Sequence, residues 1–458
     1  MSQIREQGPE VRDQTSEVRG LLSGDGIENP ESRIENRGAR ITDQQSQITN
    51  QRSAISDQTP SSVSGQRTLR VALLTGGGDK PYALGMATAL TSAGISVDFI
   101  GSDDLSVPEL LGNSQVNFRN LRGDQSSEAG LLAKVLRVLS YYGKLVLYAV
   151  TPTPKLFHIL WNNKFEFFDR TLLMLYYRIL GKKIVLTVHN VNAGKRDLND
   201  SFLNRLSLRI QYNLCHHIFV HTEGMKSELV SDFAVTADKV SVIPFGINNT
   251  VPKTDLTSSE AKRMLGIADS DKTLLFFGNI APYKGLEYLV SAFTELLNQD
   301  RSYRLIIVGR PKGSEGYWKQ IHEGIARSGI RDRIIQRIEY IPDEETELFF
   351  KAADVLILPY TRVFQSGVLF LGYSFGLPAV AADIGTLKEE IIEGKTGFVS
   401  KPQDPSDLAN VITNYFESEL FRDLETRRAE IKAFANERYS WDKVVRATTA
   451  VYSDLLRT

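Results

Sequence analysis

The stretch LLFFGNIAPYKG, residues 274–285, decides the fold class of this chain. Its first four residues are apolar and predict a buried strand that ends at Gly278, and an amphipathic helix is expected directly after the stretch. A glycine permits close backbone approach where a strand ends, and a helix N-terminus points free N–H groups and the positive end of its dipole at the same loop. The stretch therefore predicts a phosphate-binding loop in which Gly278, Asn279 and Lys284 contact the ligand. The alternative is an ordinary strand-to-helix turn with a solvated lysine.

A second loop of the same kind is predicted about ninety residues further on. The apolar run DVLILPY, residues 354–360, reads as a buried strand, and the segment after it carries Gln365, Ser366, Gly367 and Val368 before another helix. A Gln-Ser-Gly turn of this kind forms a cradle for an anion. Because ligands bind at the carboxyl ends of the strands of a doubly wound sheet, we expect both loops to face one crevice.

The N-terminal half alternates strands and helices in the same way from residue 69 onward. Its first strand, residues 70–75, opens onto a glycine-rich turn that includes Gly76 and Gly77, but Pro81 interrupts the G-x-G-x-x-G pattern of dinucleotide-binding folds. Further strands are expected at residues 96–100, 144–150, 157–161, 183–188, 217–221 and 240–243. This alternation predicts an α/β protein with two doubly wound, Rossmann-like domains.

His189 directly follows one of these strands, at a carboxyl end where such a sheet places its chemistry. An imidazole there could hydrogen-bond a sugar or acceptor hydroxyl, with a proton affinity near neutrality. The alternative is a structural histidine that ends the strand. His216, His217 and His221 lie along one strand without a facing set of carboxylates or cysteines, so we interpret them as packing residues and predict no metal site.

Four motifs together resemble the family 4 glycosyltransferases, also called group 1. They are VIPFG at 242–246, FFGNIAPYKG at 276–285, VFQSGVLFLGYSFGLPAVA at 363–381 and GTLKEEIIEGKTGFV at 385–399. The resemblance implies the GT-B fold, in which two Rossmann-like domains face each other across a cleft. It also implies a nucleotide-sugar donor as substrate, no cofactor, no metal requirement, and transfer with retention of anomeric configuration. In that family a histidine at the place of His189 contacts the transferred sugar, and the loop with Gly76 and Gly77 lies over the donor.

The chain departs from the family pattern at two places. Many members carry two glutamates eight residues apart around the second loop, where this chain has Val363 and Leu371. The basic residue common beside the first phosphate loop is also missing, because Asn279 and Ala281 occupy the available positions. We expect Gln365 and Ser366 to take over recognition of the donor.

The domain boundaries follow from composition and from the resemblance. Residues 1–67 hold no lysine and no aromatic residue, and an isoleucine recurs every seven residues from Ile27 to Ile55. Such a segment buries too little apolar surface to fold alone, so a disordered polar heptad-repeat tail is expected, with a weak helical tether or an induced coiled coil as the alternative. The acceptor domain is expected at 68–245, the donor domain at 246–436, and a C-terminal helix that crosses back to the first domain at 437–458.

Composition excludes several classes of partner and site. The 458 residues include 54 basic and 55 acidic side chains, which leaves no electrostatic signature of nucleic-acid binding. The single cysteine, Cys215, excludes an intrachain disulfide and is expected to be a buried thiol. Neither a secretory signal nor a spanning segment is indicated, so a cytoplasmic protein is expected. The aromatic segment 164–183 is interpreted either as a peripheral membrane contact or as a helix packed against the sheet.

The resemblance, together with these observations, implies a metal-independent, retaining hexosyltransferase. His189 and Lys284 are the expected catalytic residues, and a glycan, a lipid-linked molecule or a small molecule is the expected acceptor. A role in cell-envelope or exopolysaccharide synthesis is expected. Two alternatives stay open: a nucleotide-sugar epimerase, for which the sequence offers no obvious pair of cleft carboxylates, and a non-catalytic homologue that binds a sugar nucleotide or glycan.

Overall fold

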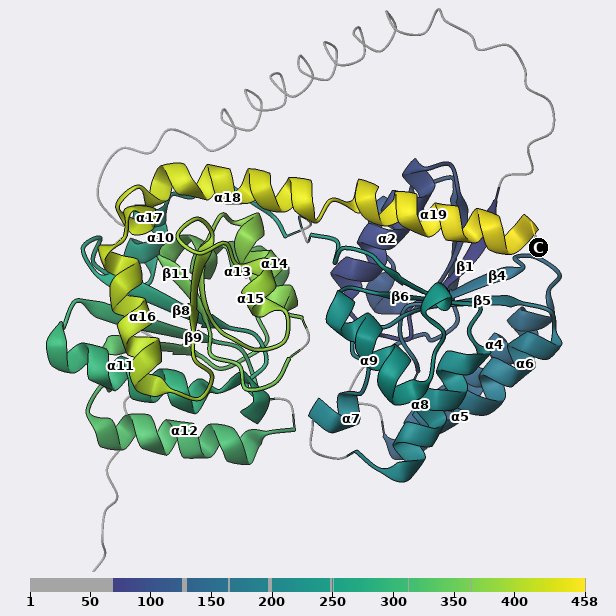
Figure 1. The fold of residues 1–458 in the computed structure, drawn as a ribbon, viewed down its shortest axis with the longest axis horizontal. Coiled ribbons are helices and arrows are strands. Elements are labelled where there is room, and N and C mark those ends of the chain that lie inside the picture. The colour runs from purple at the N-terminus through teal and green to yellow at the C-terminus, as the bar shows by residue number, and fades with distance from the viewer. Residues whose placement is uncertain are drawn as a thin grey trace, which may run out of the picture. The chain divides into compact units, whose positions relative to one another are not determined.

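The computed structural model describes residues 69–125, 130–163, 165–196, 200–247, 249, 251–311, 313–363 and 365–457. The predicted polar tail, residues 1–67, lies outside the described residues. The described chain contains two parallel sheets, each flanked by helices (Figure 1).

The first sheet has seven parallel strands in the order β3-β2-β1-β4-β5-β6-β7. Its strands are β1 (Arg70–Leu74), β2 (Ser96–Gly101), β3 (Val116–Asn120), β4 (Leu156–Ile159), β5 (Lys183–Thr187), β6 (His217–Val220) and β7 (Val240–Val242). Its helices are α2 (Lys80–Ser92), η2 (Asp103–Leu105), α3 (Pro108–Leu111), α4 (Leu131–Val150), α5 (Glu166–Phe168), η3 (Asp169–Leu173), α6 (Met174–Ile179), α7 (Ala193–Arg196), α8 (Phe202–Leu214), α9 (Glu223–Phe233) and η4 (Ala237–Lys239). The strand order reverses between β1 and β4, which is where a doubly wound sheet opens a crevice.

The second sheet repeats this topology with six parallel strands in the order β10-β9-β8-β11-β12-β13. Its strands are β8 (Lys272–Phe277), β9 (Tyr303–Val308), β10 (Ile334–Arg337), β11 (Val355–Leu358), β12 (Ala379–Ala382) and β13 (Gly397–Ser400). Its helices are α10 (Ser258–Met264), η5 (Pro282–Lys284), α11 (Leu286–Gln299), α12 (Glu315–Ser328), η6 (Arg331–Arg333), α13 (Asp343–Ala352), α14 (Gly367–Ser374), α15 (Leu387–Glu390), α16 (Pro405–Glu417), α17 (Glu419–Arg422) and α18 (Leu424–Arg438). The predicted α/β class with two Rossmann-like sheets is confirmed, and the switch point of the second sheet lies between β8 and β11.

Both faces of the central strands are buried, as parallel sheets require. All four residues of β4, of β6 and of β11 are buried. The first sheet has a separate hydrophobic core on each face, and Cys215 lies within one of them as the expected buried thiol. One core built on the second sheet includes residues from β8, α11 and α14.

The predicted strand at residues 144–150 is wrong, because these residues form the end of helix α4. A short apolar run cannot be assigned to a strand or a helix by periodicity alone, and the helix becomes evident only over its 20 residues. The strand β3 is missing from the sequence prediction. Its sequence, VNFRN, is half polar, and it lies at the edge of the sheet with no fully buried residue.

The last helix, α19 (Trp441–Arg457), packs against α2 and completes one core of the first sheet with Val444, Val445 and Tyr452 (Figure 1). The hydroxyl oxygen of Tyr452 lies 2.5 Å from Nδ1 of His158 on β4, and Nε2 of His158 lies 2.7 Å from the hydroxyl oxygen of Thr187 on β5. Ser440 accepts a hydrogen bond from the backbone N–H of Lys443 and so caps this helix.

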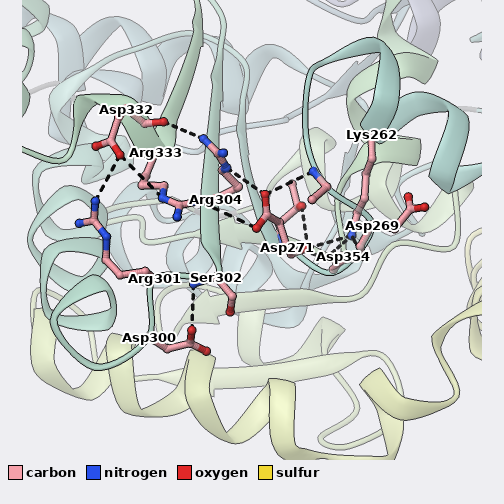
Figure 2. A network of polar contacts seen from close by, with 12 residues as sticks. Lys262, Asp269, Asp271, Asp300, Arg301, Ser302, Arg304, Asp332, Arg333 and Asp354 are labelled. Atoms are coloured by element: carbon pink, nitrogen blue, oxygen red, sulfur yellow. Dashed lines mark hydrogen bonds and ion pairs between the residues drawn. The ribbon is translucent and has the colours of Figure 1, made fainter.

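A polar network ties together the amino ends of β8, β9 and β11 (Figure 2). At its centre the buried carboxylate of Asp354 accepts hydrogen bonds from the Lys262 ammonium group at 3.0 Å and from the Thr273 backbone N–H at 2.8 Å. Lys262 also donates to the Asp271 carbonyl oxygen at 2.9 Å, and Asp271 pairs with Arg304 at 3.0 Å. This end of the sheet is opposite the carboxyl ends of the strands, so the network holds the fold and leaves the ligand-binding edge free.

Candidate active site

The loop after β8 has the predicted arrangement of strand, glycine, lysine and helix. Gly278 adopts a φ of 100°, and a Cβ atom there would lie only 2.8 Å from Nζ of Lys284, so no larger residue fits without a shift. Lys284 ends η5 and is 5% exposed. Gly285 then takes the left-handed conformation, with a φ of 63°, and begins α11. The chain thus brings a buried ammonium group to the carboxyl end of β8.

The surroundings of Lys284 suit an anion. Its ammonium group lies 3.4 Å from the Phe277 carbonyl oxygen and 5.2 Å from the centre of the Tyr360 ring, and within the described residues it has no carboxylate partner. Burial lowers the pKa of this group. An unpaired buried charge is unfavourable, whereas a bound anion would compensate it.

The loop after β11 contributes the second predicted cradle. Ser366 caps α14 by accepting a hydrogen bond from the Leu369 backbone N–H at 3.4 Å, so the N-terminus of this eight-residue helix begins at Gly367. Ser366, Gly367 and Val368 line a cavity of about 400 Å³ together with Lys284. The structure therefore brings the two predicted loops together.

Gln365 lies where this cavity meets a neighbouring one of about 440 Å³. Both cavities are lined by Gln365, Gly367, Asp79 and Phe245, which come from both sheets and the segment between them. The amide nitrogen and oxygen of Gln365 are both buried and have no hydrogen-bond partner among the described residues. Buried amide groups rarely stay unpaired, which makes Gln365 a candidate ligand contact.

His189 lies in the second of these cavities, beside the end of β5. Its ring stacks on Trp161, with 4.2 Å between the ring centroids. Burial first, and then the neighbouring rings of His221 and His158, lower its pKa well below the ordinary value. The expected proton affinity near neutrality is therefore wrong, and His189 is a neutral imidazole.

A chain of hydrogen bonds fixes which nitrogen of His189 carries the proton. Nδ1 of His221 lies 3.2 Å from the Ile243 carbonyl oxygen, which can only accept, so that nitrogen donates. Burial lowers the pKa of His221 to about 4, so its Nε2 is unprotonated and accepts from Nδ1 of His189 at 3.1 Å. Nε2 of His189 is left as a lone-pair acceptor, buried and without a partner in the described chain. It can accept a hydrogen bond from a hydroxyl group of a ligand.

The remaining predicted residues lie beside the cavities. Gly76 and Gly77 have φ values of 57° and 81°, and a Cβ atom at Gly77 would overlap the guanidinium group of Arg122 at 2.0 Å. These glycines let other groups approach the first loop, but neither lines the two cavities. Asn279 is exposed and does not line them either.

Sequence reasoning missed two carboxylates. Asp79, from the glycine-rich loop, caps α2 by accepting from the Tyr82 backbone N–H at 2.9 Å and lines both cavities. Asp343, at the start of α13, lines the cavity that holds Lys284. Burial raises the pKa of both carboxyl groups. The negative charge of Asp343 raises the pKa of Asp79 further. The sequence offered no obvious pair of cleft carboxylates, and only the structure shows these two beside the same cavity. One signal in the sequence was the capping pattern of Asp79 and Tyr82.

Other predicted features also have a place in the structure. Val363 and Leu371, which stand where many family members carry glutamates, line the cavity of Lys284. Arg362 donates to a backbone carbonyl oxygen of α7 at 3.3 Å, outside both cavities. In the part of the chain that the structure describes, no group of three or more His, Cys, Asp or Glu side chains is arranged to hold a metal ion.

Two Rossmann-like sheets, with glycine-containing loops after two neighbouring strands of one of them, are the architecture of the GT-B class of glycosyltransferase folds. Two protein-family profiles match the chain: "Glycosyltransferase Family 4" over residues 76–250 and "Glycosyl transferases group 1" over residues 271–418. Together they cover more than half of it. The chain belongs to the family 4, group 1 glycosyltransferases.

The sequence is also similar to individual family members. A D-inositol 3-phosphate glycosyltransferase of Corynebacterium efficiens is 27% identical over 283 residues, which is 59% of this chain and 65% of the relative. One from Acidothermus cellulolyticus is 30% identical over 234 residues, covering 50% of this chain and 51% of the relative. The chain thus spans between half and two thirds of these relatives.

Solved structures share the fold at lower identity. Anabaena HepE in complex with UDP-glucose matches with a TM-score of 0.65 and 18% identity, over 84% of this chain and 99% of that chain. Sucrose-phosphate synthase from Thermosynechococcus elongatus matches with a TM-score of 0.69 and 17% identity, over 85% and 100% of the two chains.

Proposed function

We propose that this protein is a retaining glycosyltransferase that moves a hexosyl group from a nucleotide sugar to a glycan, a lipid-linked molecule or a small-molecule acceptor. A role in cell-envelope or exopolysaccharide synthesis fits this proposal. The observation that carries it is the buried ammonium group of Lys284, which shares one cavity with the N-terminus of α14. Such a cavity suits the diphosphate of a nucleotide sugar.

Each side chain has a definite role in the proposed reaction. The bond between C1 of the sugar and the diphosphate oxygen breaks, and its electron pair stays on that oxygen. Lys284 and the backbone N–H groups of Gly367 and Val368 stabilise the negative charge that develops there. The acceptor hydroxyl forms the new bond to C1 on the same face, and its proton passes to the leaving phosphate oxygen. No cofactor or metal ion is required in this scheme.

Two groups would orient the sugar. Nε2 of His189 accepts a hydrogen bond from a sugar hydroxyl, and its depressed pKa makes it a poor base, so it positions the substrate without removing a proton. Gln365 lies between the two cavities and would bond the donor through its unpaired amide group.

The test is a variant of Lys284. We expect Lys284→Ala to keep the fold and to lower sugar transfer about a hundredfold, by analogy with the removal of one charge-stabilising donor. Donor turnover is measured with UDP, GDP and ADP sugars, and the exposed Lys319→Ala on α12 is the matched control. Near-normal turnover of Lys284→Ala would overturn the assignment.

The same assay separates the epimerase alternative, which Asp79 and Asp343 favour because both line the donor cavity. An epimerase inverts the C2 carbon of the donor and needs a carboxyl group as acid or base. If the product is the C2 epimer, the transferase proposal is wrong. Binding of donor without any product would instead indicate a non-catalytic homologue.

A further inference from the structure

Three helices of the first domain expose an unusual amount of apolar surface. In the described part of the chain, fourteen of the nineteen exposed large hydrophobic side chains belong to α4, to the segment from Phe165 through α6, and to α8. On α4 they are Leu132, Val135, Leu136, Leu139, Leu147 and Val150; on the second segment Phe165, Phe167, Leu172, Leu175 and Ile179; on α8 Phe202, Leu203 and Leu206. Single exposed hydrophobic residues are normal, but a contiguous set marks an interaction site.

Figure 1 shows α4, α5, α6 and α8 as neighbouring helices, and contacts between their side chains connect them. Tyr142 of α4 contacts the rings of Phe165 and Phe168, with centroids 5.6 and 5.3 Å apart. Arg170 of η3 donates to Asn204 of α8 at 2.8 Å. We call this surface the three-helix face.

The helix α4 is amphipathic along its whole length. Its buried side holds Tyr141, Tyr142, Leu145 and Ala149 within one core of the first sheet. Its exposed apolar residues recur at spacings of three or four residues and then again at Leu147 and Val150, on the same side of the helix. Twenty helical residues span roughly 30 Å, so the row of exposed apolar residues on α4 is longer than a small ligand.

The charges around the three-helix face are mostly positive. Helices α4 and α8 contain no acidic residue, whereas they carry Lys134, Arg137, Lys144, Arg205 and Arg209. On the intervening segment, Glu166 pairs with Arg170, and Asp169 is buried.

A basic cavity lies at one end of the face. Beside the C-terminal end of α4, a cavity of about 510 Å³ is lined by Lys155, Lys182, Lys183 and Arg457 and by no acidic residue. It also includes Val150, which is part of the three-helix face. A surface of apolar residues bordered by cations is complementary to an anionic lipid bilayer. The apolar side chains insert at the boundary between headgroups and acyl chains, and the cations bind the anionic headgroups.

We propose that the three-helix face binds the surface of an anionic lipid bilayer. The contact extends beyond residues 164–183 to α4 and α8, and it does not depend on the proposed transfer reaction. No helix in the described part of the chain is long and apolar enough to cross a membrane, so the face lies on the bilayer. Glu166 lies between Phe165 and Phe167 and lines the cavity of His189, so the bilayer would meet the protein beside that cavity.

The test is flotation of the full chain with lipid vesicles. We expect binding to vesicles of phosphatidylcholine mixed with phosphatidylglycerol, weaker binding to phosphatidylcholine alone, and weakening by salt. Leu136→Gln combined with Leu147→Gln should lower vesicle affinity at least tenfold, because burying one leucine contributes about that factor. The matched control is Leu111→Gln combined with Met264→Gln, two residues outside the three-helix face. Leu111, at 56% exposed, matches Leu136 at 57%, and Met264, at 68%, matches Leu147 at 72%.

A second pair of variants tests the charges. Lys155→Glu with Arg457→Glu should remove the preference for phosphatidylglycerol, whereas Lys319→Glu with Lys395→Glu on the second domain should leave it. Equal loss of binding in test and control variants, or no binding to mixed vesicles, would overturn the proposal. So would dimerisation through the face, detected by light scattering without lipid and abolished by the leucine variants. Donor turnover, measured in parallel without vesicles, stays unchanged in all these variants and separates this proposal from the enzymatic one.

Discussion

His189 and His221 show how a protein fixes the role of one side chain through another. The Ile243 carbonyl oxygen orients His221, and His221 in turn leaves Nε2 of His189 as an acceptor. A histidine on a strand end has no such definite role from sequence alone, because its tautomer is set by groups far away in the chain.

We therefore predict that His221→Leu lowers kcat/KM for the donor about tenfold, since it removes the acceptor that fixes the His189 ring. His221→Gln should retain most activity, because an amide oxygen can accept the same hydrogen bond. Nitrogen NMR should show His189 protonated on Nδ1 in the native protein and a mixture of tautomers in His221→Leu. The control is His217→Gln at the start of β6, the strand that His221 directly follows. Nε2 of His217 lies 2.9 Å from the Ser241 hydroxyl, outside this network. Unchanged tautomer and turnover in His221→Leu would contradict the role of His221.

The sequence predicted the residues of the site that belong to short local patterns. Lys284, Ser366 and Gly367 follow strands at fixed spacings, and the structure brings them into one cavity. Asp79 could be recognised as a helix cap but not as a site residue, because its place in the cleft depends on packing across the two domains. The stack of Trp161 on His189 likewise depends on residues that are distant in sequence.

At the scale of single elements, the strands before the two loops of the second sheet were predicted best. The strands β8 and β11 each contain a run of four apolar residues followed directly by Gly or Pro, and this pattern indicates a strand covered on both faces. The helix α4 was predicted poorly because part of its exposed side is apolar as well, which narrows the polar face that normally identifies a surface helix.

The network in Figure 2 gives a prediction on stability. Lys262→Met leaves the buried carboxylate of Asp354 without its cation, and we expect the free energy of unfolding to fall by about 4 kcal/mol. The double variant Lys262→Met with Asp354→Asn should recover much of this loss, because no buried charge is left unpaired. Urea denaturation measures both.

The matched control uses the neighbouring pair of Lys272 and Asp300, at 2.8 Å, whose side chains are 30% and 39% exposed. Removing one partner of a pair this accessible to water changes stability by about 1 kcal/mol or less. A loss for Lys262→Met no larger than that for Lys272→Met would show that the buried pair does not stabilise the fold.

At the scale of the whole described chain, the two cavities depend on both sheets. Asp79, Phe245 and Gln365 line both of them, although they belong to the first domain, the connecting segment and the second domain. In the proposed reaction a sugar nucleotide enters between these groups and is then shielded from water, so the proposal implies a cleft that opens and closes.

We predict that a saturating nucleoside diphosphate lowers the radius of gyration measured by X-ray scattering. The variant Lys284→Ala at the same ligand concentration should stay expanded, because it lacks the charge that holds the diphosphate against α14. If calorimetry shows that the native protein is saturated but its scattering is unchanged, the cleft is rigid and preformed.

The return of α19 to the first sheet has a consequence for synthesis of the chain. Tyr452, which contacts His158, lies 294 residues after it in the sequence. Of the two domains, the one that leaves the ribosome first is therefore the last to complete its core. Until then one face of its sheet lacks Val444, Val445 and Tyr452 and exposes apolar surface to other proteins. A premature stop codon just before Trp441 would therefore damage the domain built on the first sheet, while the domain beside the missing segment keeps its own core.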